Sequence, residues 1–265
     1  MSSILKRLTR GALPLALIAG LLAPIQAVAV TPFLQREATQ WGNVYAGPNT
    51  NVKQTPRTKI AYIEAKSKFI VNYKNFPEWA KKDFQAAVDI WSANFASTPQ
   101  ITIDASWGRS ASYGVLGSAR PGNYYSGFDG APDPSLWYPS ALANALAGRD
   151  LDPKQSEIVI QVNSLAEWNT RNDGISHQNE YDLQSVFLHE MGHGLGFLST
   201  DSYDSFFGYG SIDQPTPFDA YLQVEDGRRL SDLPTPSIEL GNALTSTLVW
   251  SGPLGIAANG GVKPL

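Results

Sequence analysis

The stretch that most constrains the fold of this chain reads His189-Glu190-Met191-Gly192-His193 and continues as Gly194-Leu195-Gly196-Phe197. Residues four apart on an α-helix lie one above the other, so a helix here brings both imidazoles together with Glu190 beside them. Asp182 has the side chain of an N-cap, and apolar residues recur after it at helical spacing. The pattern predicts a helix at about 182–195.

Two histidines and one glutamate at this spacing indicate a zinc site with its own base. Neutral imidazoles are ordinary zinc ligands, and zinc with an open coordination position lowers the pKa of its bound water to about 7. His189 and His193 are therefore the candidate ligands, and Glu190 is the candidate general base. The alternative is a helix with two surface histidines. It is disfavoured because the chain has only three histidines and two of them fall at this spacing, beside glycines.

The residues after the second histidine resemble the metzincin pattern of zinc peptidases, in which a glycine ends the active-site helix and lets the chain turn. Gly196 stands at that position, three residues after His193. The run from His193 to Ser199 looks most like the leishmanolysin-like branch and its bacterial secreted relatives. The resemblance covers roughly residues 155–200. It implies a secreted zinc-dependent metalloendopeptidase of α+β fold, with a twisted mixed sheet, the motif helix and a loop-rich insertion.

The chain departs from this family at the third zinc ligand. Most metzincins have a histidine where this chain has Ser199, and in the leishmanolysin-like branch a later histidine and a methionine-containing turn follow. No His follows His193 here, and no Met follows Met191. Either the sequence is a fragment of a longer protease, or another group completes the site.

Carboxylates are the natural substitutes for a missing imidazole, since Asp and Glu oxygens also bind zinc. The candidates are Asp201, Asp204 and Asp219, together with the remaining imidazole, His177. Each has a competing interpretation as a loop or surface residue. Glu225 is a weaker candidate, because Glu225-Asp226-Gly227-Arg228 is typical of a hairpin turn. The aspartates between 201 and 219 also raise the question of calcium, although their spacing does not match a calcium loop.

The amino terminus is typical of a secretory signal peptide. A basic start precedes a mostly apolar run from Ala12 to Leu22, and Ala27-Val28-Ala29 offers a cleavage site. The run is too short and too interrupted for a comfortable membrane span, and no later stretch could cross a bilayer. We therefore expect a secreted or periplasmic protein, cleaved near Ala29.

The net charge limits which classes of binding partner are expected, and the lack of cysteine excludes disulfides. Residues 1–29 carry three basic and no acidic side chains, so their removal changes the formal net charge from −4 to −7. An acidic exported protein is not expected to bind nucleic acid or an anionic membrane surface. Without cysteine there is no disulfide, but about 236 residues can bury a sufficient core. We expect a monomer that acts on a protein or peptide substrate.

The predicted organisation is a single globular domain in successive parts. Residues 30–57 form an extended lead-in, 58–200 the catalytic subdomain, and 201–265 an insertion or incomplete C-terminal subdomain. Strands are expected at 68–73, 101–105 and 157–162, and helices from Pro77, at 135–147 and at 237–250. One strand between 101 and 163 should bind a peptide as an added strand.

Two other functions fit the same residues. One is a catalytically inactive, secreted zincin-fold binding protein, and the other is a zinc hydrolase that cleaves amides other than peptides. Metal analysis with a casein assay separates the peptidase from the inactive protein. Turnover of a small or cell-wall amide, with proteins left uncut, would indicate the amide hydrolase.

Overall fold

The structure, a computed structural model, describes residues 33–47, 66–110, 112–170 and 180–264. They belong to one compact unit, Thr31–Leu265. The fold is α+β, with a mixed sheet and five α-helices in this part of the chain, and the expected class is confirmed. No helix within these residues is long and apolar enough to span a membrane. The predicted signal peptide and His177 lie outside the described residues.

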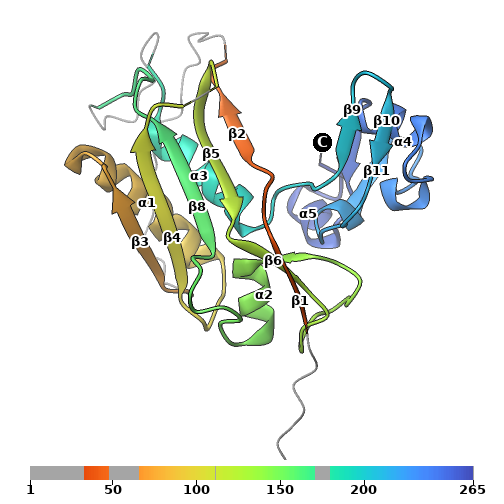
Figure 1. Cartoon of the computed structure of the whole chain (residues 1–265), viewed down its shortest axis with the longest axis horizontal. Coiled ribbons are helices and arrows are strands. Elements are labelled where there is room, and N and C mark those ends of the chain that lie inside the picture. The colour runs from red at the N-terminus through yellow and green to blue at the C-terminus, as the bar shows by residue number, and fades with distance from the viewer. Residues whose placement is uncertain (1–32, 48–65, 111, 171–179, 265) are drawn as a thin grey trace, which may run out of the picture. The chain divides into compact units, whose positions relative to one another are not determined.

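A five-stranded sheet forms the centre of the fold, in the order β2-β5-β8-β4-β3 (Figure 1). Strands β3, β4 and β8 are parallel, whereas β5 runs antiparallel to β8 and β2 antiparallel to β5. All three predicted strands are confirmed. The strands are β2 (Gly42–Tyr45), β3 (Phe69–Lys74), β4 (Ile101–Gly108), β5 (Val115–Pro121) and β8 (Ile158–Asn163).

Two helices cover the sheet and build the main core with it (Figure 1). Helix α1 (Glu78–Asn94) begins directly after Pro77, and α3 (Leu183–Leu195) packs against both α1 and the strands. Each helix buries one apolar stripe. The two stripes meet where the rings of Phe84 and Phe187 lie 4.5 Å apart between centroids. This packing fixes α3 against the sheet.

A smaller antiparallel sheet has the strand order β1-β6-β7. In the sequence its strand β7 is followed directly by helix α2 (Ser140–Ala147). The strands of this sheet are β1 (Leu34–Glu37), β6 (Asn123–Ser126) and β7 (Tyr138–Pro139). The helix predicted at 135–147 was therefore too long at its start. Pro139 is extended, with ψ 150°, and the helix begins only after it. The lead-in predicted as an extended arm contains two paired strands, β1 and β2.

Residues after 200 include a separate apolar cluster, centred on Leu222, Leu230 and Leu240. The helix predicted at 237–250 was too long: it ends at Leu244, and only the last three residues, Leu248–Trp250, form a strand. The elements are β9 (Ser202–Asp204), β10 (Tyr209–Ser211), β11 (Leu222–Val224), α4 (Ile238–Leu244), β12 (Leu248–Trp250) and α5 (Pro253–Ala258).

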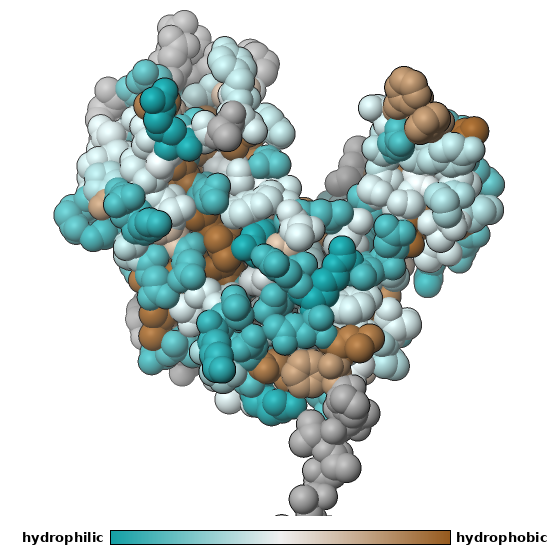
Figure 2. Space-filling view, in the orientation of Figure 1, coloured by the Kyte–Doolittle hydropathy of each residue, from teal (hydrophilic) through white to brown (hydrophobic). Residues whose placement is uncertain are grey.

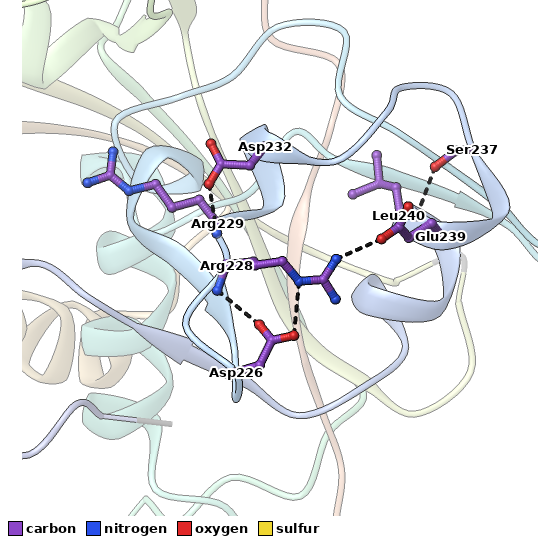
Figure 3. A network of polar contacts seen from close by, with 7 residues as sticks. All are labelled: Asp226, Arg228, Arg229, Asp232, Ser237, Glu239 and Leu240. Atoms are coloured by element: carbon purple, nitrogen blue, oxygen red, sulfur yellow. Dashed lines mark hydrogen bonds and ion pairs between the residues drawn. The ribbon is translucent and has the colours of Figure 1, made fainter.

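The predicted hairpin turn at 225–228 is confirmed. The Val224 amide donates to the Arg228 carbonyl, and Gly227 takes the positive φ, 92°, that this turn requires. The Arg228 guanidinium joins the turn to α4 by donating to the carboxylates of Asp226 and Glu239 (Figure 3). These ion pairs are exposed, so they add little stability.

The hairpin of β9 and β10 exposes hydrophobic residues at its tip (Figure 2). Phe206 and Phe207 are 86% and 64% exposed. Their amides donate to the Asp204 carboxylate, which fixes the local turn.

Candidate functional site

Helix α3 carries the motif and has well-formed ends, which confirms the predicted helix at 182–195. Asp182 is the N-cap, and its carboxylate accepts from the amide and hydroxyl of Ser185 at 2.9 and 2.6 Å. At the other end Gly196 has φ 121°, and its amide donates to the carbonyls of Gly192 and His193. A residue with a side chain rarely adopts this φ, so the glycine ends the helix as predicted.

The two motif histidines lie side by side on α3. Their ring centroids are 4.5 Å apart, with an interplanar angle of 84°. His193 Nδ1 lies 2.7 Å from the Phe197 carbonyl, so Nδ1 donates a hydrogen bond and, in the neutral ring, Nε2 carries the lone pair. Nε2 is buried and has no hydrogen-bond partner among the described residues. A buried nitrogen held in this state is suited to bind a metal ion.

His189 differs from His193 in its surroundings. Its side chain is solvent-exposed, whereas His193 is partly covered. Partial burial of the ring and the neighbouring His193 together lower the pKa of His189. Both effects favour the neutral imidazole, which is the form that binds a metal.

Glu190 is fully buried between α3 and the sheet. Its exposed fraction is 0%, and neither carboxylate oxygen has a hydrogen-bond partner in the described part of the chain. Burial raises the pKa of Glu190 to about 8, and the nearby backbone of Val44 opposes this rise without forming a hydrogen bond of ordinary geometry. A Cβ on Gly117 would lie 2.9 Å from Glu190 Oε1. The carboxylate therefore sits directly against β5.

Glycines allow α3 to approach the sheet this closely. A Cβ on Gly194 would lie 2.3 Å from Cγ2 of Ile158 in β8. On the opposite side, Trp91 of α1 donates its indole N–H to the Leu188 carbonyl at 3.0 Å. The contacts of Trp91 and Gly117 with the motif helix were not predicted from the sequence. Only long-range pairing brings these residues to the motif, and no local pattern predicts it.

Those candidates for the third ligand that the structure describes do not join the histidine pair. Among the described residues, no group of three or more His, Cys, Asp or Glu side chains is arranged to hold a metal ion. Asp204 is used in its local turn. Ser199 accepts the Asp201 amide through its hydroxyl at 3.0 Å. Glu225 is exposed in the hairpin turn.

Asp201 and Asp219 instead form a carboxylate pair of their own. One oxygen of Asp219 accepts from the amide and hydroxyl of Thr216 at 2.8 and 2.9 Å, and Thr200 donates to the same oxygen. Burial, and then the charge of Asp219, raise the pKa of Asp201 to about 7. The Ser199 hydroxyl lowers it slightly, although the Asp201 oxygens make no hydrogen bond of ordinary geometry.

The side chains present fit part of a zinc site. The two imidazoles lie side by side on α3, the carboxylate of Glu190 is buried against β5, and His193 Nε2 makes no hydrogen bond within the described residues. A structural or catalytic zinc site needs at least one more protein ligand. No protein-family model, curated protein or solved structure matches this chain.

Proposed function

We propose that this protein is a secreted or periplasmic zinc metalloendopeptidase of metzincin type. His189 and His193 are its zinc ligands, and Glu190 is its general base. The observation that carries the proposal is the buried, unpartnered Nε2 of His193, one helical turn from a second imidazole and beside a buried carboxylate. Unpaired polar groups are costly to bury, so their convergence supports a functional site.

Each side chain has a defined task in this proposal. When bound, zinc would supply a Lewis acid that polarises a peptide carbonyl and activates water. In its ionised form, Glu190 accepts the proton of the attacking water and delivers it to the leaving amine. The Phe197 carbonyl holds Nδ1 of His193, which orients the ring and keeps Nε2 free. The apolar surroundings of Glu190 strengthen its interactions by excluding solvent.

Strand β5 is the part of the sheet suited to hold the substrate. It runs beside Glu190, and its antiparallel pairing with β2 uses the edge that faces away from β8. An extended peptide could bind this edge through backbone hydrogen bonds, with specificity from alternate side chains, only by taking the place of β2. We assign the predicted peptide-binding strand between 101 and 163 to β5.

The test is the pair Glu190→Gln and Glu225→Gln. Purified proteins are analysed for bound zinc and for casein hydrolysis. Glu190→Gln should keep its zinc and lose at least a hundredfold in rate, as expected for removal of a general base. Glu225→Gln, an exposed glutamate in the hairpin turn, should match the parent. Full activity in Glu190→Gln would contradict the mechanism.

A second candidate is an inactive, secreted zincin-fold binding protein. It is favoured by the absence of a third ligand beside the histidines within the described residues. This protein would show neither zinc in stoichiometric amount nor casein hydrolysis, and Glu190→Gln would change nothing but stability.

A further inference from the structure

We infer that β2 is a built-in occupant of the position that an extended peptide takes along β5, so that the chain holds its own site in a latent form. The inference rests on the proposed function for the identity of the displaced peptide. The placement of β2 itself rests only on contacts within the chain.

Strand β2 pairs with β5 as an added peptide strand would. The two run antiparallel, with Gly42 opposite Ala119 and Val44 opposite Gly117. Beyond the strand, the Ala46 amide donates to the Gly114 carbonyl at 2.6 Å. The pairing therefore covers the part of β5 that lies against Glu190.

The same strand lies on the motif itself. A Cβ on Gly42 would be 2.2 Å from Cδ2 and 2.6 Å from Nε2 of His193, so the Gly42 backbone rests on the imidazole. Gly42 is buried, and its φ is not positive. Val44 pairs with Gly117, and a Cβ on Gly117 would lie 2.9 Å from Glu190 Oε1. An incoming peptide cannot reach these two side chains along β5 while β2 is there.

Contacts before β2 hold the segment in place. Strand β1 pairs with β6, the Gln40 amide donates to the Thr200 carbonyl at 3.1 Å, and the Arg120 guanidinium lies 5.1 Å from the Trp41 ring centroid. A tethered strand acts at a high effective concentration, on the order of millimolar for a short linker. A free peptide of ordinary affinity therefore displaces β2 only rarely, so the parent chain is expected to hydrolyse casein at a slow but measurable rate.

The first experiment compares Gly42→Val with Gly47→Val in the full chain. A side chain at 42 collides with His193, whereas a Cβ at Gly47 meets nothing within 4 Å. Diethylpyrocarbonate modifies accessible histidines, and mass spectrometry gives the ratio of His193 to His189 modification. Exposed His189 serves as the internal reference. We expect this ratio to rise at least tenfold in Gly42→Val and to stay at the parent value in Gly47→Val. An unchanged ratio in folded Gly42→Val would overturn the inference.

A second variant covers the case in which Gly42→Val does not fold. Asn43 and Ser118 are paired across β2 and β5, and the Ser118 hydroxyl donates to the Asn43 side chain at 2.7 Å. Because the chain has no cysteine, Asn43→Cys with Ser118→Cys offers a single cross-link. Diethylpyrocarbonate should modify His193 at least tenfold more slowly in the oxidised protein than in the reduced protein. Equal rates would show that β2 does not control access to the ring.

Peptide binding separates this inference from the proposed function. The probe is a fluorescent peptide with the sequence of residues 38–47, measured by anisotropy. It should bind Gly42→Val at least tenfold more tightly than the parent, because β5 is vacant only in the variant. Binding without casein hydrolysis would support the occupancy of β5 and count against the peptidase. A vacant β5 that binds no peptide would overturn the inference.

Discussion

Gly42 and His193 meet at a distance that only a glycine permits, since the nearest ring atom lies 2.2 Å from the position of a Cβ on Gly42. The strand that carries Gly42 and the helix that carries His193 are far apart in the chain. Their contact places the lead-in segment on the candidate site. The motif and its cover therefore belong to one structural unit.

Two glycines of the motif helix should respond oppositely to alanine. In Gly194→Ala the new Cβ would lie 2.3 Å from Ile158, and this overpacking should cost about 1–3 kcal/mol. In Gly192→Ala the nearest atom, on Trp91, is 3.6 Å away, so the gain in helix propensity should stabilise the protein by up to about 1 kcal/mol. Chemical denaturation measures both. Equal destabilisation by the two variants would mean that α3 does not pack on β8 in this way.

The N-cap of α3 should contribute measurably to stability. Asp182→Ala removes the acceptor of the Ser185 amide and should cost about 1 kcal/mol in the free energy of unfolding. Asp182→Asn is the matched control, because asparagine also caps helices and should lose only a few tenths. A loss in Asp182→Asn as large as that in Asp182→Ala would assign the effect to charge rather than to capping.

The helix and the parallel strands could be predicted because their patterns are local. The spacing of Leu183, Val186 and Phe187 predicts α3, and the β-branched apolar residues around Ile103 and Ile160, where burial alternates along the strand, predict β4 and β8. Pro139 shows the limit of such patterns. It suits the first turn of a helix as well as the end of a strand, and here its partner Tyr124 on β6 extends the strand up to it.

The position of β2 over His193 could not be predicted, since it depends on pairing between segments that are distant in the sequence. Nothing in the sequence around Gly42 indicates that β5 will be its partner or that His193 will lie beneath it. The proximity of Asp201 and Asp219 could not be predicted from the sequence either. Asp201 and Asp219 were predicted as loop residues or zinc ligands, and only the fold brings them together out of solvent.

Zinc should stabilise the folded protein through the histidine pair. A ligand that binds only the folded state adds about 2.7 kcal/mol at a concentration one hundred times its Kd. The thermal midpoint should therefore rise with added zinc, and EDTA should reverse the rise. His189→Ala should remove the effect, while Asp204→Asn should keep it because Asp204 serves its local turn. An equal shift in parent and His189→Ala would place the zinc elsewhere.

Asp201 should make the protein less stable as the pH rises through neutrality. Its pKa is about 7 in the folded protein, against 3.8 for the free side chain, so the folded state binds the proton more tightly. The stabilisation is complete below the unfolded value and is lost as the pH rises to about 7. Asp201→Asn cannot ionise, so it should exceed the parent by at least ~1 kcal/mol at pH 8 and show no such advantage at pH 4. Urea denaturation at the two pH values measures this difference, with Asp213→Asn as the control because Asp213 is exposed. Equal changes in stability for Asp201→Asn and Asp213→Asn at both pH values would contradict the raised pKa of Asp201 in the folded protein.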